Sequence, residues 1–139
     1  MPRRSRNRVD LYAWTIALIL ATAVVLLAAA SVHAVASPER PPGDPSRGKT
    51  VYQVCMGCHS LDEDDVGPHH RGVVGRVAGT VPGYAYSPAL KNSHIVWSPD
   101  TLDRWLTNPQ ALVPGTKMYF SMADPQKRAD LIAYLTELK

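Results

Sequence analysis

The sequence predicts an all-α domain preceded by one apolar N-terminal helix. Three Asp-Pro or Ser-Pro pairs, at positions 44–45, 98–99 and 124–125, have the form of a helix N-cap followed by proline at the first helical position. An uncharged, strongly apolar stretch covers residues 11–36. Without this leader about 100 residues remain, which is the size of one small domain.

The positive charge of the chain is concentrated in residues 1–10. Four of the first eight residues are arginine, whereas from residue 11 onward eleven basic and eleven acidic residues cancel. The net charge of +3 therefore belongs to the leader, and it is no argument for nucleic-acid binding. We expect this basic segment to stay in the cytoplasm, ahead of an apolar segment that crosses the membrane.

Residues 11–36 are interpreted as a transmembrane anchor. About 20 helical residues span about 30 Å, one hydrocarbon core, and Tyr12 and Trp14 lie where aromatic rings favour the interface. A cleaved signal peptide is the alternative, since Ala34-Val35-Ala36 has the form of a cleavage site. We favour the anchor because the apolar run is longer than a signal peptide needs. Either interpretation places everything after residue 36 outside the cytoplasm.

Residues 37–46, rich in proline and polar side chains, are predicted to be a linker, and residues 47–139 the domain. An extended linker of this kind reaches about 3 Å per residue. Asp44-Pro45 is expected to open a helix that carries Gly48. A glycine inside a helix costs about 1 kcal/mol, so we expect another helix, the last one, to approach closely at Gly48.

Two further helices are predicted after this one. The first begins at Ser98-Pro99 and ends before Asn108-Pro109. The last begins at Asp124-Pro125 and continues to the C-terminus. Its apolar stripe consists of Leu131, Tyr134, Leu135 and Leu138.

The strongest chemical signal is Cys55-Met56-Gly57-Cys58-His59, the C-x-x-C-H pattern of covalent c-type haem attachment. A thioredoxin-like dithiol needs a βαβ setting that the chain does not predict. A zinc site needs four ligands, and the other histidines provide no tidy second pair. A plain disulfide would leave His59 unexplained. The sequence therefore predicts one haem c bound through Cys55 and Cys58, in a compartment where bacteria attach haem covalently.

Short stretches around this motif occur in the order and spacing of a known family. They are Gly-Lys-Thr-Val-Tyr at 48–52, Cys-Met-Gly-Cys-His-Ser at 55–60, Gly67-Pro68, Gly-Val-Val-Gly-Arg at 72–76, Gly79, Pro-Gly-Tyr-Ala-Tyr-Ser at 82–87, Ile-Val-Trp at 95–97, Thr101-Leu102, Asn108-Pro109, Pro-Gly-Thr-Lys-Met-Tyr-Phe at 114–120 and Arg-Ala-Asp-Leu-Ile-Ala-Tyr-Leu at 128–135. Over residues 48–138 the chain resembles class I cytochrome c of the mitochondrial and alphaproteobacterial type. The resemblance implies about three to five short helices around one haem.

The resemblance also implies which residues hold the haem. His59 would be the proximal iron ligand, oriented by the Pro68 carbonyl, and Met118 the opposite ligand. From the residues alone, Met118 competes with Met122 and the other histidines, because an isolated methionine usually packs in a core. The residues implied to hydrogen-bond the haem propionates are Arg76, Tyr86, Trp97 and Thr116.

Three residues near the expected site depart from the family pattern. Trp105 replaces a tyrosine whose hydroxyl usually reaches the methionine sulfur, and its N–H can only donate. His70 replaces a leucine usually near the haem. It is a candidate for binding the iron in place of the expected ligand, but we favour an exposed loop histidine. His94 replaces a common glycine and is assigned no role.

The resemblance implies a one-electron carrier that is not an enzyme and is monomeric. Its donor would be a cytochrome bc complex and its acceptor a terminal oxidase or photosynthetic reaction centre, reached through an apolar patch at the haem edge. Val54, Gln110 and Ala111 occupy places often taken by docking lysines. The remaining candidates are Lys49, Lys91, Lys117 and Arg104. Alternatives are a fixed subunit of an oxidase or reaction-centre complex, and a haem peroxidase.

Overall fold

The structure, a computed structural model, describes residues 40–139. The basic segment 1–10, the anchor or signal peptide predicted over 11–36, and the first residues of the predicted linker lie outside the described residues. Within residues 40–139, none of the helices combines the length and the apolar character that crossing a bilayer requires.

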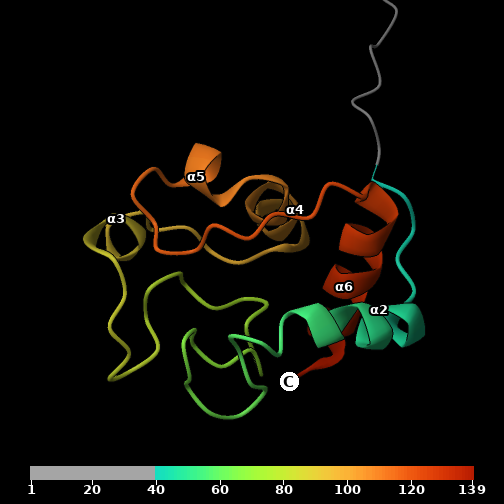
Figure 1. Ribbon diagram of the computed structural model, residues 1–139, viewed down its shortest axis with the longest axis horizontal. Coiled ribbons are helices and arrows are strands. Elements are labelled where there is room, and N and C mark those ends of the chain that lie inside the picture. The colour runs from blue at the N-terminus through green and yellow to red at the C-terminus, as the bar shows by residue number, and fades with distance from the viewer. Residues whose placement is uncertain (1–39) are drawn as a thin grey trace, which may run out of the picture. The chain divides into compact units, whose positions relative to one another are not determined.

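The described part is helical, as predicted (Figure 1). Its elements are α2 (Pro45–Val51), the 3₁₀ helix η1 (Tyr52–Val54), α3 (Pro88–Lys91), α4 (Pro99–Thr107), α5 (Pro109–Leu112) and α6 (Pro125–Glu137). Between residues 40 and 139, β pairing is limited to one isolated antiparallel bridge between Val77 and Val96. The long irregular segments between the helices therefore need packing partners other than a sheet.

Each of the five α-helices in residues 40–139 begins at a proline that follows a capping side chain. The caps are Asp44, Ser87, Ser98, Asn108 and Asp124, and each accepts a hydrogen bond from a backbone N–H of its helix. The three helix starts predicted from sequence are confirmed. The starts at Ser87-Pro88 and Asn108-Pro109 have the same signature but lead into helices of only four residues.

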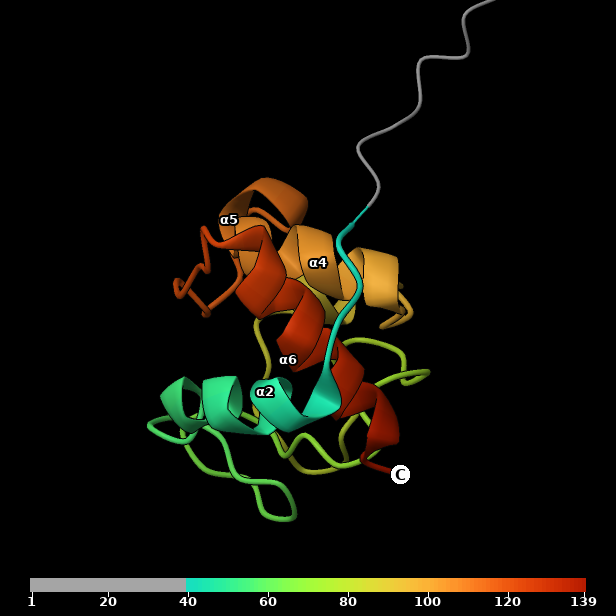
Figure 2. The ribbon, with the colours of Figure 1, turned by 90° about the vertical axis from the view of Figure 1, so that its right-hand side faces the viewer.

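Helix α2 lies directly against α6 (Figures 1 and 2). A β-carbon placed on Gly48 would lie 2.0 Å from the backbone oxygen of Asp130, so only glycine allows the two backbones this close. The expected approach of the last helix at Gly48 is therefore confirmed. Tyr52 and Leu131, 3% and 1% exposed, belong to the core beside this crossing.

Residues 40–44 are bound to the domain and are not a free tether. Arg40 Nη1 donates to the carbonyl oxygen of Pro99 at 2.6 Å, and Gln126 Nε2 donates to that of Pro42 at 2.9 Å. Residues 45 and 46 already belong to α2. The linker predicted over 37–46 thus extends too far, because its proline and cap residues serve the start of a helix and its contacts with α4 and α6.

Asp130 joins residues 40–44, α2 and α6 through one buried carboxylate. It accepts from Arg47 Nη2 and Nε, both at 2.8 Å, from the Asp44 N–H at 2.8 Å and from Gln126 Nε2 at 3.0 Å. The side chain is almost fully buried. The hydrogen bonds from Arg47 outweigh desolvation and hold the pKa of Asp130 well below its usual range.

Asp130→Asn is expected to lower the free energy of unfolding at pH 7 by about 2 kcal/mol, because it removes a charged acceptor from four donors. The depressed pKa means that wild-type stabilisation is present above about pH 4 and is lost as the pH falls. The stability gap between wild type and variant should therefore narrow below about pH 4. Urea unfolding of the wild-type and Asp130→Asn holoproteins from pH 3 to 7 measures this difference in the free energy of unfolding. Glu63→Gln, at an exposed residue, is the control. A gap that does not change with pH would contradict this assignment.

Candidate haem-binding site

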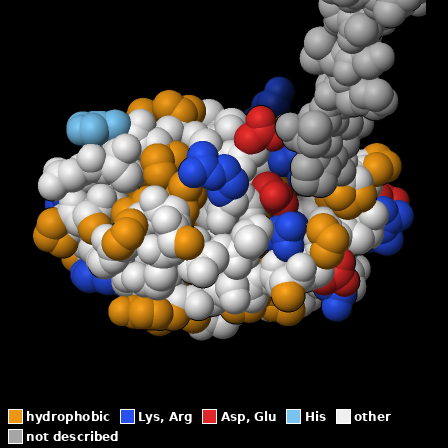
Figure 3. Space-filling view, turned by 90° about the horizontal axis from the view of Figure 1, so that it is seen from above, with side chains coloured by type: hydrophobic (Ala, Val, Ile, Leu, Met, Phe, Trp, Pro, Cys, Tyr) orange, Lys and Arg blue, Asp and Glu red, His pale blue; other side chains and the backbone are white. Residues whose placement is uncertain are grey.

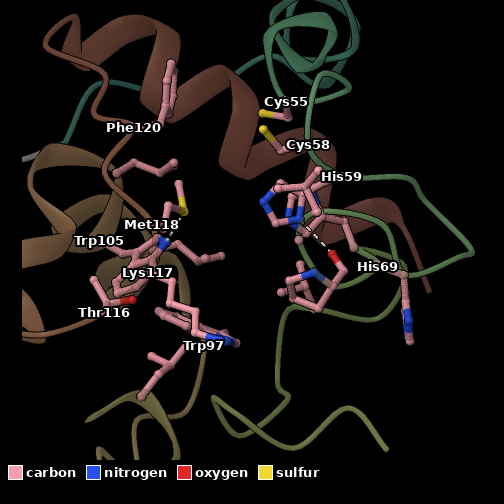
Figure 4. Close-up of a pocket in the computed structure, with 18 of the residues that line it drawn as sticks. Cys55, Cys58, His59, His69, Trp97, Trp105, Thr116, Lys117, Met118 and Phe120 are labelled. Atoms are coloured by element: carbon pink, nitrogen blue, oxygen red, sulfur yellow. Dashed lines mark hydrogen bonds between the residues drawn. The ribbon is translucent and has the colours of Figure 1, made fainter. Parts of the chain in front are cut away.

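The C-x-x-C-H motif forms a helical turn that continues from η1. The N–H of Cys55 donates to the Tyr52 carbonyl, and the N–H of His59 to the Cys55 carbonyl, each at 2.9 Å. This turn places the sulfurs of Cys55 and Cys58 next to each other at the edge of one cavity (Figure 4). No disulfide joins the two cysteines. Burial, with Cys58 nearby, raises the pKa of Cys55 to about 11, so its thiol is neutral at pH 7.

The imidazole of His59 faces the same cavity in a defined tautomer. Its Nδ1 lies 2.7 Å from the carbonyl oxygen of Pro68, which can only accept, so Nδ1 carries the hydrogen. Nε2 is left with its lone pair. Burial lowers the pKa of His59, which keeps the ring neutral. A neutral imidazole with Nε2 unprotonated is the form that binds a metal.

Two neighbours of His59 were missed from sequence. Gly67 packs against the ring so closely that a β-carbon there would lie 2.1 Å from His59 Cε1. His70 stacks on His59 with ring centroids 4.0 Å apart and an interplanar angle of 20°. The expectation of an exposed His70 is wrong, because its backbone N–H bonds to the Ser60 carbonyl and returns the loop to the motif.

His70 is a neutral, half-buried wall residue of the cavity. Its Nδ1 lies 3.2 Å from the hydroxyl of Tyr52. Burial, and then electrostatic repulsion from neighbours that include the Arg76 guanidinium, lower the pKa of His70 to about 3. His94, in contrast, is exposed, and its φ of 53° explains why glycine suits that position.

Met118 lies on the opposite wall of the cavity from His59 (Figure 4). The indole Nε1–H of Trp105, on α4, donates to the Met118 sulfur at 3.2 Å. The indole that replaces the usual tyrosine therefore does reach the thioether. Met122 is buried in the core and does not line the cavity. Of the two methionines, the geometry favours Met118 as the residue that faces His59.

The four polar residues assigned to the propionates all line this cavity: Arg76, Tyr86, Trp97 and Thr116. Trp97 and Thr116 are buried, on the same side of the gap as Met118. The Arg76 guanidinium is held by the backbone oxygens of His69, at 3.0 Å, and Arg71. The fold therefore brings hydrogen-bond donors from residues 76–97 and from residue 116 to one cavity, whose lining is otherwise apolar.

These features fit a porphyrin. The cavity is lined mainly by apolar side chains, with two thiols at its edge, an imidazole lone pair and a thioether sulfur on opposite walls, and a group of N–H and O–H donors for two carboxylates. A small helical domain with this arrangement defines a protein of the c-type cytochrome class.

Comparison with known proteins agrees with this class. Residues 45–139 match the family described as Cytochrome c. Cytochrome c2 of Rhodopila globiformis is 52% identical over 103 residues, which are 71% of this chain and 97% of that protein. Cytochrome c of Sesamum indicum is 44% identical over 104 residues, 71% of this chain and 94% of that protein.

Two solved structures share the fold. Cytochrome cH from Methylobacterium extorquens has a TM-score of 0.66 and 44% identity, covering 68% of this chain and 98% of that one. Ferricytochrome c2 from Rhodopseudomonas palustris has a TM-score of 0.66 and 39% identity, covering 69% and 99%. The chain belongs to the cytochrome c family, is a cytochrome c2-like electron carrier, and binds one haem c covalently through Cys55 and Cys58.

Trp105→Phe is expected to lower the midpoint potential by about 40 mV. The indole N–H points its positive end at the Met118 sulfur and so opposes positive charge on the iron. Losing a hydrogen bond worth about 1 kcal/mol corresponds to about 40 mV for a one-electron couple. Spectroelectrochemical titration measures the shift, with the 77% exposed Tyr119→Phe as control. An unchanged or raised potential would exclude this role for the indole.

Proposed function

We propose that this protein carries single electrons and that His59 and Met118 would both bind the haem iron. The observation that carries this is their placement on opposite walls of one cavity. The bound haem supplies an iron that alternates between Fe(II) and Fe(III). With two protein ligands in place, no coordination position is left for a substrate.

The surrounding residues hold these two ligands in place. Pro68 accepts from His59 Nδ1 and so maintains the lone pair of Nε2 toward the cavity. Trp105 donates to the Met118 sulfur and limits its rotation. Arg76, Tyr86, Trp97 and Thr116 are proposed to bind the propionates, because buried carboxylates need donors.

The mouth of the cavity supports a docking role. Val54, Val66, Tyr119 and Phe120 line it and are 57%, 71%, 77% and 44% exposed. Lys117, counted among the docking lysines, instead donates its Nζ to the Ala85 carbonyl at 2.8 Å. On the face shown in Figure 3, acidic and basic side chains are interspersed. We therefore propose a contact surface that depends on apolar area more than on long-range charge.

The partners follow from this carrier function. We propose a cytochrome bc complex as donor and a terminal oxidase or photosynthetic reaction centre as acceptor, on the periplasmic side of a bacterial inner membrane. Weak electrostatic steering favours the membrane anchor over residues 11–36, because confinement raises the effective concentration of the partners. A fixed subunit of one such complex is the second candidate, and stoichiometric copurification with a single enzyme would favour it.

Carbon monoxide binding tests the closed site. The reduced native holoprotein is expected not to bind carbon monoxide at neutral pH, and Met118→Ala is expected to bind it readily. Tyr119→Ala, at the 77% exposed residue that follows Met118 in the chain, should behave as wild type. Ready binding by the native protein would contradict the carrier assignment and favour the peroxidase alternative.

The anchor has a separate test. A haem-stained gel of salt-washed membranes beside the periplasmic fraction, with the intact mass of the stained band, shows whether residues 11–36 are retained. We expect a membrane band that keeps them. A periplasmic band that begins near residue 37 would establish the signal-peptide alternative and a diffusing carrier.

A further inference from the structure

We infer that Gln110 is a positioning residue that holds the ligand loop, residues 114–118, and slows dissociation of Met118 from the iron. This inference rests on the proposed ligation by Met118. Gln110 lies on α5, next to the fully buried Pro109, and its own side chain is half-buried. Sequence analysis treats it only as a missing docking lysine.

The amide of Gln110 makes three hydrogen bonds to the ligand loop. Its Nε2 donates to the carbonyl oxygens of Thr116, at 2.8 Å, and Met118, at 3.2 Å. Its Oε1 accepts from the N–H of Gly115 at 3.3 Å. One side chain therefore bridges the backbone from the turn to the methionine, including the carbonyl of Met118 itself.

The chemistry of these contacts requires a carboxamide. The loop presents two acceptors and one donor to position 110, which a neutral amide satisfies. An ammonium can only donate, and a carboxylate can only accept. A lysine at this position would leave the Gly115 N–H without this acceptor, and a glutamate would face two carbonyl oxygens.

The loop has few other restraints within the described part of the chain. Gly115 adopts φ 85°, and the turn is closed by the Thr116 N–H donating to the Val113 carbonyl at 3.1 Å. Trp105 contacts the sulfur of Met118, and Lys117 reaches the Ala85 carbonyl from an exposed position. Gln110 is thus the side chain that restrains the loop backbone at both 116 and 118.

The test measures how fast an external ligand replaces Met118. Stopped-flow binding of cyanide to the ferric holoprotein at pH 7, at cyanide concentrations where the rate is limited by methionine dissociation, reports loop opening. Gln110→Ala is expected to increase this limiting rate on the order of tenfold. Gln110→Glu, which is isosteric, is expected to increase it at least as much, and it serves if the alanine variant folds poorly.

Gln126→Ala is the matched control. Its amide makes two hydrogen bonds, to the Pro42 carbonyl at 2.9 Å and to Asp130 Oδ1 at 3.0 Å, but Gln126 does not line the cavity. It should lower global stability and leave the cyanide rate within twofold of wild type. Amide hydrogen exchange at Gly115 is expected to speed up in the Gln110 variants and not in this control.

Two results would overturn the inference. One is a limiting rate in both Gln110 variants within twofold of wild type, and the other is an equal increase in Gln126→Ala. Failure of the underlying ligation is distinguishable, because the native protein would then bind carbon monoxide readily and Met118→Ala would not alter cyanide binding. If the native protein does not bind carbon monoxide and the limiting rate of cyanide binding is unchanged in the Gln110 variants, only the role of Gln110 is rejected.

Discussion

Gly67→Ala is expected to displace the His59 imidazole and open the iron to carbon monoxide while the haem stays covalently attached. A β-carbon at position 67 would lie 2.1 Å from Cε1, 2.5 Å from Nδ1 and 2.6 Å from Nε2 of His59. All three distances are far inside van der Waals contact, so the ring must move and its 2.7 Å bond to the Pro68 oxygen must break. The two thioether bonds at Cys55 and Cys58 do not depend on this contact.

The reduced variant is examined by carbon monoxide difference spectra, and its intact mass reports the attached haem. Gly57→Ala is the matched control, because a β-carbon there would meet no atom within 4 Å, although it lies inside the attachment motif. It should retain both the haem and a closed iron. A Gly67→Ala protein that stays closed to carbon monoxide would contradict the proposed ligation by His59.

Gly48→Ala is expected to destabilise the fold itself. Its β-carbon would lie 2.0 Å from the Asp130 backbone oxygen and 2.7 Å from the Tyr134 β-carbon. These atoms belong to the body of α6 and cannot rotate away, so α2 and α6 must separate. Overpacking of this kind costs about 3 kcal/mol or more, which lowers the Tm of a domain of about 100 residues by more than about 10 °C.

Thermal unfolding of the holoprotein by circular dichroism measures this effect. The same Gly57→Ala control should change Tm by no more than about 4 °C, since it adds a methyl group in open space. A Gly48→Ala variant with the Tm of the control would show that α2 is not held against α6 at this distance in solution.

Helix starts could be predicted from sequence because their physics is local. Asp44, Ser98 and Asp124 accept hydrogen bonds from N–H groups two or three residues further along the chain. The capping residue and the start of its helix are therefore neighbours in the sequence. The four-residue helices α3 and α5 carry the same signature at Ser87 and Asn108. They escaped prediction because so short a segment shows no apolar periodicity.

Contacts between distant segments could not be predicted in this way. The sequence gives no sign that His70 stacks on His59 instead of facing solvent, since this depends on the loop returning to Ser60. From the sequence, position 110 is noticed only because Gln110 stands where the family often has a lysine. The three hydrogen bonds of the Gln110 amide exist only because α5 packs beside the ligand loop.

By itself the sequence determined the chemistry of this protein: the C-x-x-C-H motif selects covalent haem, and the spaced family stretches select His59 and Met118 as candidate ligands. Only the tertiary structure decided how those candidates are held, through Gly67 and Pro68 behind His59 and Trp105 and Gln110 around Met118. The reason is that the kind of chemistry open to a motif depends on the atoms of the motif itself. Its orientation is set by atoms that folding brings from elsewhere in the chain.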